Sequence, residues 1–140
     1  MTVLELDRIG HAYFGRTVLD QISLNVDAAE IVALVGPSGC GKSTLIHIAA
    51  GIVDQRYGRI RSHYNRHGMI FQEPRLLPWA TANENIAYPL RIAGMTRRDR
   101  DERVKRAATR VAFELADLDK YPSELSGGMQ QRIAIARALV

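Results

Sequence analysis

The sequence has few of the features that mark secreted or membrane-spanning chains. Its 140 residues contain one cysteine, Cys40, which excludes an intrachain disulfide and a cysteine-based metal site. No run of about 18 apolar residues occurs, so we expect no membrane span. The acidic Glu5 and Asp7 stand where a signal peptide needs an apolar stretch. These absences predict a reducing, cytoplasmic setting.

The sequence also has only a small excess of positive over negative charge. Lys and Arg number 19 against 15 Asp and Glu, and the resulting net charge of +4 does not by itself predict a nucleic-acid partner. The hydrophobic fraction of 46% is ordinary for a globular chain. The length fits one domain that is large enough to bury a core.

What the sequence does contain is a glycine-rich segment that fits G-x-x-x-x-G-K-[ST], the phosphate-binding P-loop. Its residues are Gly36, Pro37, Ser38, Gly39, Cys40, Gly41, Lys42, Ser43 and Thr44. Glycines let successive backbone N–H groups turn inward around anionic oxygens. Lys42 supplies positive charge for the β- and γ-phosphates, and the Ser43 hydroxyl suits Mg²⁺, which prefers oxygen ligands. The segment predicts a site for a nucleotide and Mg²⁺.

The flanking residues supply the strand and helix that this motif requires. Residues 31–35 are apolar and mostly β-branched, which predicts a strand buried on both faces. Residues 45–50 predict a helix that is closed by Gly51 and whose positive dipole end faces the phosphates. The alternative interpretation, a glycine-rich turn with an exposed lysine, does not explain this order of elements.

The rest of the chain predicts a β region followed by helices. Two strands are expected over 3–14 and 17–26 around a turn at Gly15-Arg16, and two short extended pieces over 59–63 and 69–72. Helices are expected over 82–93 and 97–116. Apolar residues along the second helix are spaced by three and four: Val104, Ala107, Ala108, Val111 and Leu115. Its opposite face mixes basic and acidic residues, which favours a solvated face over contact with lipid or RNA.

A second helix start shaped to meet an anion lies near residue 126. Ser126 is an expected N-cap, and Gly127 and Gly128 follow it directly. The residues from Ile133 to Val140 are almost all good helix formers. Taken alone, this pattern also fits a simple capped helix.

Two such helix starts in this order give the chain a resemblance to the nucleotide-binding subunit of ATP-binding cassette (ABC) transporters. Gly36–Thr44 resembles Walker A, and the run from Leu125 to Gln130 resembles the ABC signature. Tyr13 is similar to the aromatic residue that stacks on adenine. Gln72 is similar to the Q-loop glutamine, which reaches Mg²⁺ and the attacking water. The resemblance implies that Lys42 and Gln72 serve catalysis and that Ser43 and Gln72 serve Mg²⁺.

The same resemblance implies a fold and an assembly. The fold is the α/β fold of P-loop NTPases, with a RecA-like parallel core, an antiparallel β region and an inserted α-helical subdomain. Residues 1–72 correspond to the ATP-binding core, 73–127 to the helical subdomain and signature, and 128–140 to the signature helix. Two subunits pair head to tail, so four signature residues act in trans on the partner's ATP: Ser126, Gly127, Gly128 and Gln130.

A finer likeness lies in residues 71–79, which end in Trp79. This segment resembles the importers of nitrate, sulfonates, taurine and related small anions, and a Trp beside prolines suits a docking surface, although a core Trp that anchors the loop is an alternative. The resemblance implies membrane permease subunits as partners, a periplasmic or lipoprotein solute-binding protein as an indirect partner, and no nucleic acid. It places the chain on the cytoplasmic face of the membrane, as a peripheral subunit.

The sequence departs from the family pattern after the signature. The 140 residues contain no Walker B strand ending in Asp-Glu, and the segment Glu114–Asp117 falls on an expected helix instead. All four histidines lie at or before His67, so no switch histidine is present. The fold is therefore expected to be incomplete at the C-terminus, and a chain that ended at Val140 would be defective in hydrolysis. Two alternatives to an importer ATPase stay open: a nucleotide-binding module without turnover, and a soluble ABC-type ATPase.

Overall fold

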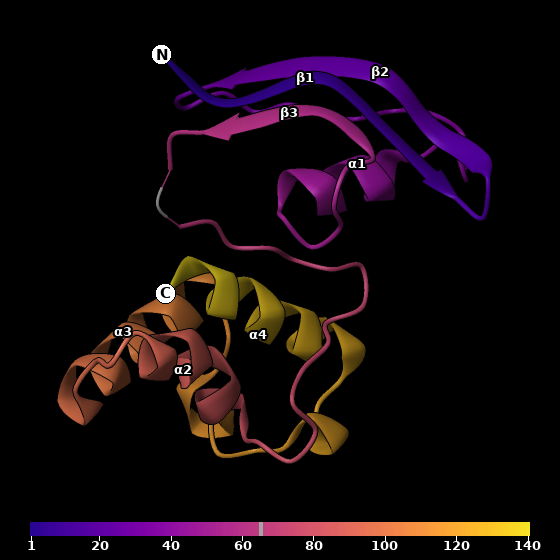
Figure 1. Ribbon diagram of the computed structural model, residues 1–140. Coiled ribbons are helices and arrows are strands. Elements are labelled where there is room, and N and C mark those ends of the chain that lie inside the picture. Colours follow the sequence, from indigo (N-terminus) through magenta and orange to yellow (C-terminus); the bar gives the residue numbers. More distant parts are fainter. Residues whose placement is uncertain (65) are drawn as a thin grey trace. The chain divides into compact units, whose positions relative to one another are not determined.

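The computed structural model describes residues 1–64 and 66–140, and it divides into two compact units (Figure 1). The first unit comprises Met1–His67 and contains a sheet and one helix. The second comprises Gly68–Val140 and is helical apart from its loops.

The first unit is built on an antiparallel sheet. Its strands are β1 (Thr2–Tyr13), β2 (Arg16–Asp27) and β3 (Tyr57–Ser62), in the order β2-β1-β3. Both expected N-terminal strands and the piece at 59–63 are thus confirmed. The turn lies one residue earlier than predicted, at Phe14-Gly15, where φ is 47° and 80°. Positive φ at both residues matches the twist of a two-residue hairpin, which explains the shift.

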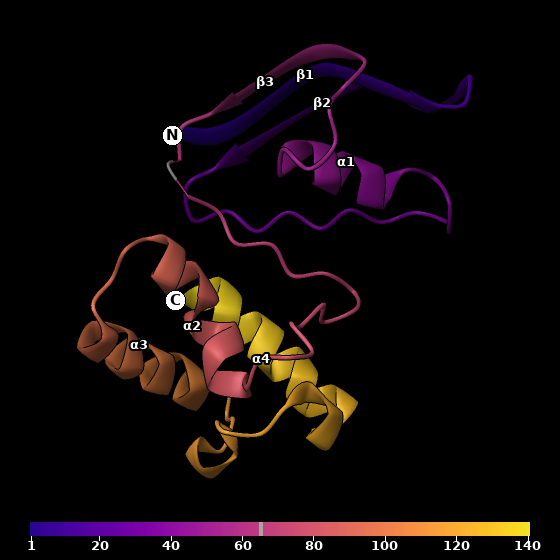
Figure 2. The same cartoon turned by 60° about the horizontal axis from the view of Figure 1, so that its bottom comes forward.

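The helix of this unit, α1 (Lys42–Ala49), packs against one face of the sheet (Figure 2). The buried side chains between them come from both elements: Leu6, Ile9, Leu19, Leu45 and Ile48. Gly51, with φ of 68°, follows the helix as predicted. This packing fixes the start of α1 against the sheet and thereby positions the P-loop.

The prediction of a buried strand at 31–35 is wrong for this structure. These residues form no strand, and the side chains of Ile31 and Val35 are 96% and 90% exposed. Leu34 alone packs against the core of the unit. A strand needs a neighbour to complete its hydrogen-bond ladder. In the described part of the chain the only sheet is the antiparallel one, so the segment is extended without a partner, and the predicted parallel core is not formed.

The second unit packs three α-helices around one core. They are α2 (Ala82–Ile92), α3 (Arg97–Arg110) and α4 (Gly127–Leu139), with two short 3₁₀ helices, η1 (Leu115–Asp117) and η2 (Pro122–Glu124), before α4. Twelve buried residues form the core: Ala82, Ile86, Ala87, Leu90, Val104, Ala107, Ala108, Phe113, Leu118, Leu125, Ile133 and Ala136. Both predicted helices in this region and the signature helix are therefore confirmed.

Two details of the prediction for this unit are wrong: the end of the second helix and the extended piece at 69–72. The helix expected to reach residue 116 ends at Arg110, because Ala112 turns into the left-handed region with φ of 53° and delivers Phe113 to the core. Leu115 therefore leaves the predicted apolar face and is 46% exposed. The extended piece at 69–72 is not a strand either. Gly68, directly before this piece, packs against α4: a Cβ on it would lie 2.7 Å from the carbonyl oxygen of Ala138.

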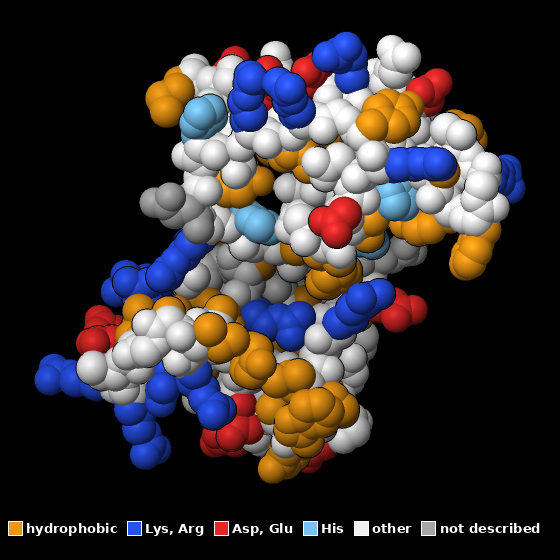
Figure 3. All heavy atoms as spheres, in the orientation of Figure 1, with side chains coloured by type: hydrophobic (Ala, Val, Ile, Leu, Met, Phe, Trp, Pro, Cys, Tyr) orange, Lys and Arg blue, Asp and Glu red, His pale blue; other side chains and the backbone are white. Residues whose placement is uncertain are grey.

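The charged residues of α3 lie on the surface, as predicted for a solvated face. Basic side chains (blue) gather over this helix in Figure 3. Arg106 pairs with Glu102 one turn earlier, at 3.5 Å. Both side chains are about 70% exposed, so the pair contributes little to stability.

Candidate nucleotide-binding site

The N-terminus of α1 differs from those of the other helices. Thr81, Thr96 and Ser126 cap α2, α3 and α4, each accepting a hydrogen bond from a backbone N–H in the first turn. The N-cap of α1 is Gly41, which has no side chain to do this, and the first turn carries no acidic residue. The first backbone N–H groups of a helix have no partner within the helix. The start of α1 is therefore arranged to receive an anion from outside the chain.

Glycines shape the loop in front of this helix start. Gly41 has φ of 94°, and a Cβ on it would lie 2.9 Å from the Leu19 side chain and 3.0 Å from the carbonyl oxygen of Val18. A Cβ on Gly36 would lie 2.9 Å from Cys40 Sγ. Gly39, with φ of 79°, has open space at its Cβ position. Two glycines thus allow close packing, and the third leaves the loop accessible to a ligand.

Lys42 lies over this loop. Its Nζ donates hydrogen bonds to the carbonyl oxygens of Gly36, at 2.8 Å, and Pro37, at 2.7 Å, and lies 3.5 Å from Cys40 Sγ. The ammonium group is therefore held above the P-loop by neutral acceptors. Phosphate oxygens would form stronger, charge-assisted hydrogen bonds with it.

The next residue offers an oxygen ligand. Ser43 is exposed on the first turn of α1. The described residues contain no cluster of three or more His, Cys, Asp or Glu that could hold a metal. A hydroxyl combined with phosphate oxygens is a donor set that Mg²⁺ accepts. The residues present therefore fit a Mg²⁺ ion that enters with a nucleotide.

Tyr13 lies at the hairpin end of β1, 42% exposed. The hairpin is near the P-loop, because His11 pairs with Leu19, the residue that Gly41 approaches. The His11 ring packs edge-on against Tyr13, with 4.5 Å between ring centroids. Both His11 ring nitrogens are buried without a hydrogen-bond partner among the described residues. Sequence reasoning missed His11, although its place two residues before Tyr13 on a strand puts both rings on one face.

Gln72 belongs to the second unit and is exposed at a bend. Arg137 of α4 holds the segment that follows, since its guanidinium donates to the carbonyl oxygens of Pro74 and Arg75 at 3.0 and 3.1 Å. Burial lowers the pKa of Arg137 from its ordinary value. The Arg75 guanidinium also lies 4.5 Å from the centre of the Phe71 ring. Nothing in the sequence pattern pointed to Arg137 as the anchor of this loop.

The signature residues lie at the start of α4. Ser126 Oγ accepts a hydrogen bond from the Met129 N–H at 3.3 Å. Gly127 and Gly128 have open space at their Cβ positions, so packing within the chain does not require them to be glycine. The Gln130 side-chain amide donates to the carbonyl oxygens of Pro122 and Leu125, at 2.8 and 3.2 Å, and fixes the turn before the helix.

Asn85 is a further residue that sequence reasoning missed. It is fully buried on α2, and its side chain bonds the backbone of Leu77, Ala80 and Thr81. These bonds hold the loop that carries Trp79, which is 74% exposed. The alternative of a core Trp that anchors the loop is therefore wrong, because Asn85 is the anchor. A helix-period pattern of apolar residues gives no signal for a buried amide.

The segment Glu114–Asp117 is not a strand end. Glu114 directly precedes the 3₁₀ helix η1, which the other three residues form. Asp117 forms an ion pair with Lys120 at 2.6 Å. No helix in the described residues has both the length and the apolar character to cross a bilayer.

The folded P-loop and the capped Ser-Gly helix start define a class: P-loop nucleotide-binding proteins with a second anion-facing helix start. Residues 19–140 match the model of the ABC transporter family. The chain belongs to that family.

Curated relatives match over nearly the whole chain. The taurine import ATP-binding protein TauB of Escherichia coli O157:H7 is 36% identical over 144 residues, which cover 98% of this chain and 56% of the relative. The protein of the same name from Chromobacterium violaceum is 40% identical over 148 residues, covering 99% and 56%. The chain thus spans about half the length of these relatives.

Solved structures confirm the predicted P-loop NTPase fold class, of which the described residues form the antiparallel sheet and the helical part. A bacterial ABC transporter cassette solved as a dimer superposes with a TM-score of 0.91 and 30% identity, covering 97% of this chain and 68% of the cassette. The cassette in a post-hydrolysis state, bound to ADP and Pi, gives a TM-score of 0.88 at 28% identity, with the same coverage.

Proposed function

We propose that the chain is the ATP-binding and ATP-hydrolysing part of an ABC importer of small anions such as taurine, other sulfonates or nitrate. The single observation that carries this proposal is the uncapped N-terminus of α1. It follows a glycine loop whose carbonyl oxygens bond Lys42. The likeness to taurine import proteins supports the importer assignment.

In the proposed site, the P-loop binds the phosphates of ATP. The backbone N–H groups from Gly39 to Thr44 surround the phosphate oxygens, and Lys42 leaves its loop carbonyls to pair with the β- and γ-phosphates. Tyr13 stacks on adenine, supported by His11. Mg²⁺, when bound through Ser43 and Gln72, would neutralise charge on the phosphates. Gln72 would orient the attacking water.

The signature residues are proposed to act in trans on ATP bound to a second copy. Gly127 and Gly128 are open at their Cβ positions, which permits another chain's ligand to approach the helix start closely. Ser126 would offer its hydroxyl there, and Gln130 would hold the turn in place. The γ-phosphate would then join two subunits, and its hydrolysis would release them.

The membrane partner would contact the second unit. Trp79 and several other large apolar side chains are exposed on that unit, among them Ile70 and Ile92. We propose that this surface docks a permease, that a solute-binding protein takes part only indirectly, and that the chain is peripheral on the cytoplasmic face. No nucleic acid is involved in this proposal.

The first experiment measures MgATP binding and phosphate release by the protein and by its Lys42→Ala variant. We expect binding to weaken about thirtyfold or more, because a charge-assisted contact with phosphate is lost. Lys105→Ala, which removes an exposed lysine from α3, is the matched control and should bind as the parent does. Equal binding by both variants would contradict the proposed site.

Two alternatives are separated by the same measurements. A nucleotide-binding module without turnover would bind MgATP and release no more phosphate than Lys42→Ala. A soluble ABC-type ATPase would hydrolyse ATP but fail to co-purify with a permease. Recovery with a membrane permease, together with ATP-dependent uptake of taurine, supports the importer.

A further inference from the structure

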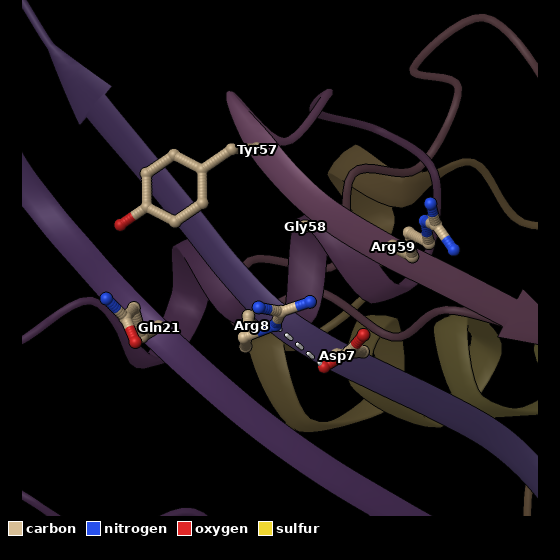
Figure 4. Close-up of a pocket in the computed structure, with 6 residues that line it drawn as sticks. All are labelled: Asp7, Arg8, Gln21, Tyr57, Gly58 and Arg59. Atoms are coloured by element: carbon tan, nitrogen blue, oxygen red, sulfur yellow. Dashed lines mark ion pairs between the residues drawn. The ribbon is translucent and has the colours of Figure 1, made fainter.

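A pocket of about 270 Å³ lies on the solvent-facing side of the sheet, and none of the P-loop residues lines it (Figure 4). Six residues from all three strands form it: Asp7, Arg8, Gln21, Tyr57, Gly58 and Arg59. The nucleotide site described above uses none of them.

The pocket occurs where all three strands depart from regular geometry. Arg8 on β1, Gln21 on β2 and Gly58 on β3 have φ of 50°, 49° and 98°. The register of β1 shifts at this level against both of its neighbours. A left-handed conformation is strained for a non-glycine residue, and such strain is found where the local shape serves a purpose.

The irregularities turn extra polar residues outward. On β1, Asp7 and Arg8 are consecutive and lie between the buried Leu6 and Ile9. On β2, Asp20 and Gln21 follow the buried Leu19 in the same way. A regular strand would send every second residue to the core. The bulges thus concentrate hydrogen-bonding groups on one side of the sheet.

The remaining strand closes the pocket. A Cβ on Gly58 would lie 2.5 Å from the carbonyl oxygen of Arg8, so only glycine allows this approach. The Tyr57 ring crosses Gly10 of β1, and its hydroxyl donates to the Asp20 carboxylate on β2. That hydrogen bond raises the pKa of Tyr57. The protonated phenol thus links β3 to β2.

The charges favour an anion. Arg8 Nε lies 3.4 Å from Asp7 Oδ1, which leaves both terminal nitrogens of Arg8 without a partner among the described residues. Arg59 has no ion pair or side-chain hydrogen bond with any residue that the structure describes. Figure 4 shows Arg8 between Gln21 and Asp7, with Arg59 on the neighbouring strand. Asp20 is engaged by Tyr57.

We propose that this pocket is a second ligand site, separate from the nucleotide site, that binds a small anion through Arg8 and Arg59. The ligand carries a carboxylate, sulfonate or phosphate group, whose oxygens match the donor fork of a guanidinium. The Gln21 amide supplies a further donor. The site does not depend on ATP binding or hydrolysis.

The test titrates the ¹⁵N-labelled protein with inorganic phosphate, acetate and methanesulfonate while NMR follows the amides of residues 7, 8, 58 and 59. These amides report on the pocket separately from the P-loop, which also binds phosphate. We expect saturable shifts with at least one probe. Arg8→Gln and Arg59→Gln should each weaken binding about tenfold, the equivalent of one charge-assisted hydrogen bond.

The matched control is Arg61→Gln, on the same strand but outside the pocket and paired with Glu5 at 3.2 Å. It should bind the probe as the parent does. Both test residues are exposed, so the variants should keep the parent's spectrum away from the pocket. The proposal is overturned if no probe gives saturable shifts at these amides, or if both Arg variants bind as Arg61→Gln does.

Discussion

The two units differ in how they satisfy their own polar groups. In the second unit, side chains cap all three α-helices, and Asn85 and Arg137 bond the loop carbonyls. In the first unit, α1 starts without a side-chain cap, and residues 31–35 pair with no strand among the residues that the structure describes. Ligands are therefore expected at the first unit, because polar groups that the chain leaves unsatisfied mark a surface that something else completes.

One part of the second unit breaks this pattern. Ser126 caps α4, yet the two glycines after it serve no packing purpose within the chain. Glycine in the first turn of a helix loses stability relative to alanine. The signature thus resembles the P-loop more than it resembles the other helix starts of its own unit.

The most severe way to break the cohesion of the second unit is Asn85→Ala. Four hydrogen bonds would be lost, leaving the Leu77 N–H and the Ala80 carbonyl without the side-chain partner that Asn85 supplies. The carbonyls of Leu77 and Thr81 would keep their backbone donors. We expect a loss of about 3 kcal/mol in local stability, measured by hydrogen exchange of the α2 amides. Asn83→Ala is the control, because its side chain is partly exposed. Equal losses in the two variants would contradict the anchoring role.

A smaller effect is expected from Arg137→Met, which keeps the length of the side chain but removes its hydrogen bonds to Pro74 and Arg75. We expect a loss of about 2 kcal/mol, since two carbonyl groups lose a charged donor. The loop should then open more often, and trypsin should cleave faster after Arg75. Arg98→Met, exposed on α3, should leave that rate unchanged. An unchanged rate in Arg137→Met would show that the loop is held by other contacts.

The sequence predicts best those features that are encoded by neighbouring residues. Helices of the second unit were predictable because their periodicity and caps are local: Thr81 and Glu84 form a capping box, and Ser126 caps α4. The P-loop was predictable because its spacing encodes its geometry. The end of α3 was missed, because burial of Phe113 rather than helix propensity decides where the chain turns.

What the sequence could not predict depends on partners distant along the chain. Residues 31–35 look like a buried strand, but strand formation requires a neighbour that apolar composition cannot supply. The bulges at Arg8 and Gln21 carry no glycine or proline signal. Arg137 acts on a loop 62 and 63 residues earlier, which only the fold brings near it. Asn85 bonds the turn directly before its own helix, but apolar periodicity does not reveal a buried amide. Local patterns thus gave the elements, while long-range contacts set the loops and the pocket.

One substitution in the signature should have opposite effects on stability and function. Gly128→Ala should stabilise the protein by about 0.5–1 kcal/mol, because its site is helical and its Cβ position is open. It should also slow ATP hydrolysis if the partner's nucleotide approaches this position. Thermal unfolding and phosphate release measure the two effects. A stabilised variant with unchanged hydrolysis would contradict the role in trans.

The smallest effect is expected in the first unit, at Tyr57. Its hydrogen bond to Asp20 raises the pKa above the ordinary value of 10.0, so the folded state holds this proton more tightly than the unfolded state does. The bond therefore contributes its full stability below about pH 10 and loses it as the pH rises through the folded pKa. The difference in urea midpoint between the parent and Tyr57→Phe should be constant at neutral pH and shrink above about pH 10. Tyr88→Phe, an exposed tyrosine on α2, should show no such trend. A difference that stayed constant into the alkaline range would mean that packing of the ring over Gly10, rather than the hydrogen bond, is what Tyr57 contributes.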